Sequence, residues 1–146
     1  MVVLATSAYD PTEQVVLWCL RRQAEGGADA ERAIRRNLSH GGATGHGQRC
    51  FCALQALQRA LAAYGRRRLQ FAEVGAGTVT ADEAALLGLL HAEQTGDEAE
   101  IDSRLCWLVR REGRWQCREA LGRLLDALTA AYPDVAAPQA AAGPAA

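Results

Sequence analysis

Residues 80–96 read TADEAALLGLLHAEQTG, and this stretch contains both the start and the end of one helix. Thr80 and Glu83 match the S/T-x-x-E capping box, in which each side chain accepts a hydrogen bond from the backbone N–H of the other residue. Gly96 supplies a stop signal. The leucines that follow at helical spacing are Leu86, Leu89 and Leu90. The stretch therefore predicts an amphipathic helix with a leucine face turned toward a core.

Helical spacing of apolar residues continues on the C-terminal side of this stretch. A helix that begins near Asp97 and ends at Glu112-Gly113 would bury Ile101, Leu105 and Leu108. The last predicted helix covers residues 114–132 and ends before Pro133. Its inward residues are Cys117, Leu121, Leu124, Leu125 and Leu128.

The N-terminal half predicts three more helices and one segment of another kind. The Asp-Pro-Thr-Glu start signal at residue 10 opens the first helix, which runs to about residue 24, and the next two cover about 29–38 and 44–64. In residues 66–79, Leu69 and Phe71 alternate with polar neighbours. That pattern predicts either a short β-hairpin or an irregular crossing near 69–79.

These elements indicate an all-α protein, a compact bundle of about six helices. We expect a single helical domain over residues 10–133. Residues 1–9 are predicted to form a flexible N-terminus. The tail 134–146 is rich in alanine and proline, with nothing to bury, and is predicted to be disordered.

The bulk composition excludes several classes of function. The formal net charge of −1 gives no overall field that would favour nucleic acid or an acidic membrane. No apolar run is long enough to predict a transmembrane helix, and the start lacks the pattern of a signal peptide. Five scattered cysteines suit a reducing, cytoplasmic setting. All 16 basic residues are arginine, which is typical of a GC-rich bacterial genome.

The loop that leads into the third predicted helix offers a candidate metal site made of His40, His46, Cys50 and Cys52. Histidine and cysteine are ligands for zinc and other soft metals. Cys50 and Cys52, however, would point about 200° apart on a regular helix. If the helix begins before Cys50, that residue joins the leucine stripe as a small buried hydrophobe. If it begins after Cys52, a metal- or thiol-responsive sensor becomes plausible; otherwise we expect no cofactor.

No residue constellation predicts an enzyme. The sequence lacks a nucleophile elbow and an HExxH motif. Asp82 and Glu83 are explained by helix capping, so they give no reason to expect a buried carboxylate pair. We therefore favour a protein without enzymatic activity.

The sequence offers two candidate sites for nucleic acid, an arginine patch and a possible helix-turn-helix. Arg59, Arg66, Arg67 and Arg68 predict a patch for an anion or nucleic acid. The helices near 80–111 could resemble a helix-turn-helix, which would make the chain a DNA-binding regulator. The would-be recognition helix opens with the acidic run DEAEID at residues 97–102, which would repel phosphates. DNA binding is therefore an alternative that we do not favour.

The tryptophans indicate a third kind of site. Each tryptophan falls away from the centre of the aliphatic stripe on its helix, and tryptophan beside arginine is common in the hot spots of protein interfaces. The candidate partner-binding residues are Trp18, Trp107, Arg110, Arg111, Arg114 and Trp115. The competing interpretation is that these rings close a second layer of the bundle. We expect an adaptor or regulatory protein that binds a protein partner or a second copy of itself.

Overall fold

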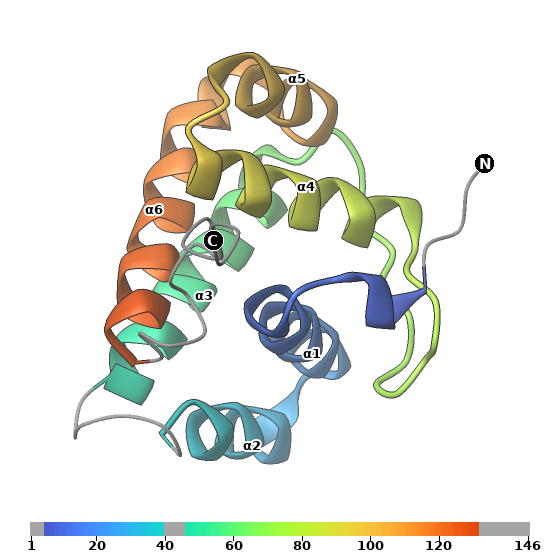
Figure 1. Cartoon of the computed structure of the whole chain (residues 1–146), viewed down its shortest axis with the longest axis vertical. Coiled ribbons are helices and arrows are strands. Elements are labelled where there is room, and N and C mark those ends of the chain that lie inside the picture. The colour runs from blue at the N-terminus through green and yellow to red at the C-terminus, as the bar shows by residue number, and fades with distance from the viewer. Residues whose placement is uncertain (1–4, 40–45, 132–146) are drawn as a thin grey trace, which may run out of the picture.

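A computed structural model describes residues 5–39 and 46–131 of the chain, and these ranges form six α-helices and two 3-10 helices without a strand (Figure 1). The elements are η1 Thr6–Ala8, α1 Pro11–Glu25, α2 Gly27–Ser39, α3 His46–Tyr64, α4 Ala81–Thr95, α5 Glu98–Leu108, η2 Arg111–Gly113 and α6 Arg114–Ala131. The predicted all-α bundle of about six helices is confirmed. The first four residues and the predicted disordered tail, 134–146, lie outside the described residues.

Helix α4 packs against three other helices of the bundle. Figure 1 shows it crossing above α1 and beside α5, and it also contacts α6. The predicted face of Leu86, Leu89 and Leu90 is buried, but Leu87 is buried as well. The difference arises because neighbours cover α4 on several sides, and a helix with apolar residues around most of its circumference is a buried one.

The helix ends follow the sequence signals closely. Asp10 caps α1, with Pro11 at the first helical position and Glu13 completing a capping box. Thr80 and Glu83 form the second box, at the start of α4. Gly96 ends α4 in the left-handed conformation that glycine adopts without strain.

Helices α3 and α6 lie side by side along most of their lengths, and α2 packs against α3 at the other side (Figure 1). Their shared interior belongs to one core that includes α1 and α4. The largest fully buried apolar side chains of this core are Leu17, Ile34, Leu38, Leu54, Leu57, Leu87, Leu89, Leu90, Ile101, Leu108 and Leu128.

Of the two alternatives for residues 69–79, the structure has the irregular crossing. This loop, residues 66–80, runs from the end of α3 to the start of α4 and turns at Gly75, whose φ is +88°. The N-terminal segment lies against it: the Thr6 N–H donates to the Gly77 carbonyl at 2.8 Å and the Thr6 hydroxyl to the Ala76 carbonyl at 3.0 Å. Residues 5–9 of the predicted flexible N-terminus are therefore hydrogen-bonded to the domain.

In the described part of the chain, no helix combines the length and the apolar character that a membrane span requires.

Candidate functional site

The start of α4 carries a buried carboxylate that sequence analysis explained only as a helix cap. Glu83 is completely buried and accepts a bidentate pair of hydrogen bonds from Arg21 of α1, at 3.0 and 2.9 Å. Its two oxygens also accept the N–H groups of Ala72 at 2.7 Å and Thr80 at 3.0 Å. One side chain thus joins α1, the crossing loop and α4.

Arg21 completes this network from the other side. It is 3% exposed, and its remaining N–H groups donate to the carbonyls of Ala76 and Thr78 at 2.9 and 2.8 Å. Burial alone would raise the pKa of Glu83, but the hydrogen bonds from Arg21, Thr80 and Ala72 outweigh it and the pKa is lowered. The carboxylate of Glu83 is therefore ionised at neutral pH. We call Arg21, Glu83 and the backbone groups bonded to them the buried hub.

The neighbouring carboxylate, Asp82, is 3% exposed and turns to a different partner. Its oxygens accept two hydrogen bonds from Arg67, at 2.9 and 2.5 Å, and one from the Gln70 N–H at 2.6 Å. The guanidinium of Arg67 also lies over the ring of Trp107, 4.7 Å from its centroid. The expectation that Asp82 and Glu83 serve capping alone was therefore wrong, because both also bind remote arginines.

The ends of α3 and α5 meet through a reciprocal exchange of hydrogen bonds. The Arg66 N–H donates to the Leu108 carbonyl at 3.1 Å, and the Arg110 N–H donates to the Tyr64 carbonyl at 2.8 Å. The side chains repeat the exchange: Arg66 Nε donates to the Cys106 carbonyl of α5 at 2.6 Å. We call residues 63–67 and 106–111 the junction.

The Arg110 side chain makes the matching bond in the opposite direction, since its guanidinium donates to the Ala63 carbonyl of α3 at 2.7 Å. Each helix C-terminus is thus capped by the arginine that follows the other helix, where positive charge also favours the helix dipole. Gly113 packs so closely on Tyr64 that a Cβ there would lie 2.1 Å from the tyrosine Cβ. The structure thereby brings together Arg66 and Arg110, which belong to two separate arginine runs of the sequence.

The tryptophans have different surroundings. Trp18 is partly buried and packs against the core, as the second-layer interpretation expects. Trp107, 47% exposed, and Trp115, 70% exposed, are the exposed large hydrophobic side chains of the described residues. Trp115 lies in the first turn of α6, and the preceding Arg114 has a buried Nε without a hydrogen-bond partner in the described structure.

The candidate metal ligands fall on both sides of the limit of the described structure. His40 lies outside the described residues. His46 is the first residue of α3, and its side chain is not among the described ones. Since α3 begins before Cys50, that thiol is buried in the core while Cys52 is exposed. Among the described residues, no three histidine, cysteine or acidic side chains gather where they could hold a metal ion.

The buried thiols are poorly suited to redox chemistry. Burial raises the pKa of Cys50 and of Cys117 to about 11, and burial together with the nearby Cys50 raises the pKa of Cys19 to about 12. A thiol must ionise to act as a nucleophile, so these three are unreactive near neutral pH. The sensor hypothesis remains a prediction, which depends on Cys52 and the two histidines.

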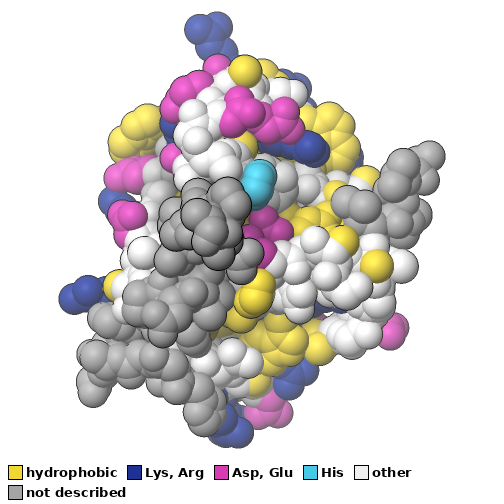
Figure 2. Space-filling model, viewed as in Figure 1, with side chains coloured by type: hydrophobic (Ala, Val, Ile, Leu, Met, Phe, Trp, Pro, Cys, Tyr) yellow, Lys and Arg dark blue, Asp and Glu magenta, His cyan; other side chains and the backbone are white. Residues whose placement is uncertain are grey.

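The helices proposed for DNA binding, α4 and α5, present few free cations. Glu98 in the first turn of α5 forms a bidentate ion pair with Arg118, at 2.9 and 2.6 Å. Figure 2 shows acidic and basic side chains interspersed on the face in view, rather than a continuous field of one sign. Binding to the DNA backbone needs several cations available to phosphates, so this geometry gives the DNA hypothesis no support.

Comparisons with family models, with curated proteins and with solved structures gave no match to this chain.

Proposed function

We propose that the chain is a protein-binding module that recognises an acidic segment of a partner protein at the junction. The observation that carries this proposal is the fixed position of Trp107. Its ring is about half exposed, yet the guanidinium of Arg67 lies over it, and Asp82 holds that guanidinium with two hydrogen bonds. An exposed aromatic ring that is already ordered loses little conformational entropy when a partner covers it.

The charge around Trp107 favours an acidic partner. The junction contains Arg66, Arg67, Arg110 and Arg111, and the side chain of Arg111 forms no ion pair or hydrogen bond with the described residues. Three of these four guanidiniums are hydrogen-bonded within the protein, which positions them but leaves few for a run of phosphates. Tryptophan next to ordered arginine is characteristic of hot spots in protein interfaces. A peptide segment with carboxylates beside an apolar residue fits this surface better than a nucleic acid does.

The proposal is tested by selecting displayed peptides on the full chain and measuring the affinity of the enriched sequences by fluorescence anisotropy. We expect enrichment of peptides that place Asp or Glu beside an apolar residue. Trp107→Ala should weaken their binding at least about tenfold, because hot-spot truncations cost roughly 2 kcal/mol or more. Binding should also weaken as salt concentration rises.

Arg32→Gln is the matched control, since Arg32 is an exposed arginine of α2 far along the chain from the junction. This variant should bind the peptides like the wild type. Equal affinity of the wild type and Trp107→Ala, or enrichment of peptides without acidic residues, would contradict the proposal. Tighter binding of a labelled DNA duplex than of any peptide at low salt would favour the DNA alternative instead.

A further inference from the structure

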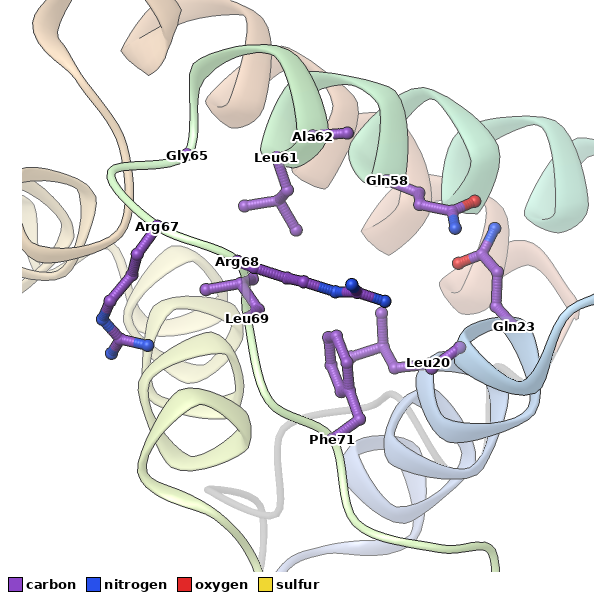
Figure 3. Close-up of a pocket in the computed structure, with 11 residues that line it drawn as sticks. Leu20, Gln23, Gln58, Leu61, Ala62, Gly65, Arg67, Arg68, Leu69 and Phe71 are labelled. Carbon is purple, nitrogen blue, oxygen red and sulfur yellow. The ribbon is translucent and has the colours of Figure 1, made fainter.

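A cavity of about 520 Å³ lies between α1, α3 and the beginning of the crossing loop (Figure 3). This volume is within the range of binding sites for small molecules. Its walls combine apolar side chains from all three elements with a few polar groups. The apolar lining comes from Leu20 and Ala24 of α1, Leu61 and Ala62 of α3, and Leu69 and Phe71 of the loop.

The loop wall of the cavity is hydrogen-bonded to the start of α4. Leu69 and Phe71 line the cavity, and the backbone N–H of the residue between them, Gln70, donates to Asp82 at 2.6 Å. The Ala72 N–H is bonded to Glu83 at 2.7 Å. The cavity wall is thus anchored by the start of α4.

Arg67 and Arg68 have opposite orientations. Both residues line the cavity, but in Figure 3 the guanidinium of Arg67 points away from it. The guanidinium of Arg68 extends into the cavity, between Phe71 on one side and the amides of Gln23 and Gln58 on the other. Arg68 has no hydrogen-bond or ion-pair partner within the described part of the chain, and no aspartate or glutamate lines the cavity. Arg67 is paired with Asp82, so Arg68 is the arginine of the cavity lining whose charge no carboxylate of the described residues offsets.

We propose that this cavity binds an organic monocarboxylate with an apolar body. The planar guanidinium of Arg68 matches a carboxylate through two parallel hydrogen bonds, and the apolar walls cover the rest of the molecule. Gln23 and Gln58 can donate or accept hydrogen bonds beside the carboxylate. A doubly charged phosphate fits less well, because Arg68 is the one cation directed into the cavity and the C-terminal, negative end of α3 borders it at Gly65. This site adjoins the junction at Gly65 and Arg67, but it does not depend on the proposed function.

Isothermal titration calorimetry on the full chain tests the proposal with octanoate, its neutral amide octanamide, and inorganic phosphate. We expect saturable binding of octanoate, weaker binding of octanamide and no binding of phosphate. Arg68→Gln should weaken octanoate binding about tenfold or more, because hydrogen bonds to charged groups are the strong ones. The same substitution should leave octanamide binding nearly unchanged. Arg59→Gln is the matched control, since Arg59 is an exposed arginine of α3 outside the cavity lining.

A second variant tests the cavity without touching its charge. Ala62 lines the cavity and is exposed, so Ala62→Trp adds bulk there without crowding the core, and it should abolish octanoate binding. Circular dichroism confirms that each variant is folded. Absence of saturable octanoate binding to the wild type would overturn the proposal. So would equal octanoate affinity in the wild type and Arg68→Gln, or binding of phosphate in preference to octanoate.

Discussion

The buried hub at the start of α4 and the junction at the ends of α3 and α5 use the same chemistry in opposite surroundings. In the hub, Arg21 and Glu83 are withdrawn from water together with the backbone groups that they bind. In the junction, Arg66 and Arg110 bind helix carbonyls at the exposed surface. Water can replace a lost bond at the surface but cannot reach a buried charge, so the two regions should respond very differently to the same kind of substitution.

The largest effect is expected from Arg21→Met. The substitution leaves the carboxylate of Glu83 buried without its cation, which should lower the free energy of unfolding by about 3–5 kcal/mol. Urea denaturation followed by circular dichroism measures this loss. The neighbouring Arg22→Met is the control, since Arg22 forms a partly exposed pair with Glu25 and its loss should cost less than about 1 kcal/mol. Similar losses in both variants would show that the hub is not energetically special.

A double variant sharpens this prediction. Replacing a buried ion pair by two apolar side chains is often neutral. Here, however, Arg21→Met with Glu83→Met also removes the acceptor for the Ala72 N–H and the donors to Ala76 and Thr78. We therefore expect the double variant to remain well below wild-type stability in the same urea experiment. Full recovery would mean that the crossing loop does not depend on the hub.

The junction should be most sensitive where its backbone packs tightly. Gly113→Ala forces a Cβ against Tyr64, and overpacking of this kind costs about 1–3 kcal/mol. Gly122→Ala is the matched control, because nothing lies within 4 Å of a Cβ at that position in α6. In that helix interior alanine should instead stabilise the protein by about 0.5–1 kcal/mol. Thermal unfolding of the two variants should therefore shift in opposite directions, and a shared direction would contradict the close approach at Gly113.

Acid should weaken the hub before it weakens the junction. The pKa of Glu83 is lower in the folded protein than its usual value, so its contribution to stability is present above the unfolded pKa of about 4.3. That contribution is lost as the pH falls through the lowered, folded pKa. Urea midpoints between pH 7 and pH 3 should fall for the wild type. Arg21→Met should show a shallower fall, and identical slopes would contradict the assignment.

The smallest effects are expected at the crossed caps of the junction. Arg66→Gln and Arg110→Gln each remove a bond from an exposed arginine to a helix C-terminus, which is worth about 0.3–1 kcal/mol. Arg111→Gln, which loses no hydrogen bond within the described structure, should leave the melting temperature unchanged. A loss of several kcal/mol in either cap variant would place the junction in the same class as the hub.

Local signals in the sequence were enough to predict the helices. Asp10 and Thr80 cap their helices through residues three positions away, and Gly96 ends α4 through its own backbone angles. Such signals act within one turn, so they can be read without knowledge of the fold. The leucine stripes likewise identified most of the core.

The partners of charged residues could not be predicted in this way. Arg21 lies 62 residues before Glu83, and nothing local marks it as a buried residue. Arg67 and Arg68 look identical in the run RRR, yet one is bound to Asp82 and the other enters a cavity. No local signal separates these two arginines, because their partners come from α4 and from the cavity walls.

The crossed caps at the ends of α3 and α5 have a consequence for the motions of the protein. Because the arginine after each helix secures the last turn of the other, neither helix end can fray without freeing the other. The backbone amides of Arg66 and Arg110, each bonded to the opposite helix, should then exchange their hydrogens in one shared opening event. Two segments about forty residues apart in the chain thus act as a single cooperative unit at the surface that carries Trp107.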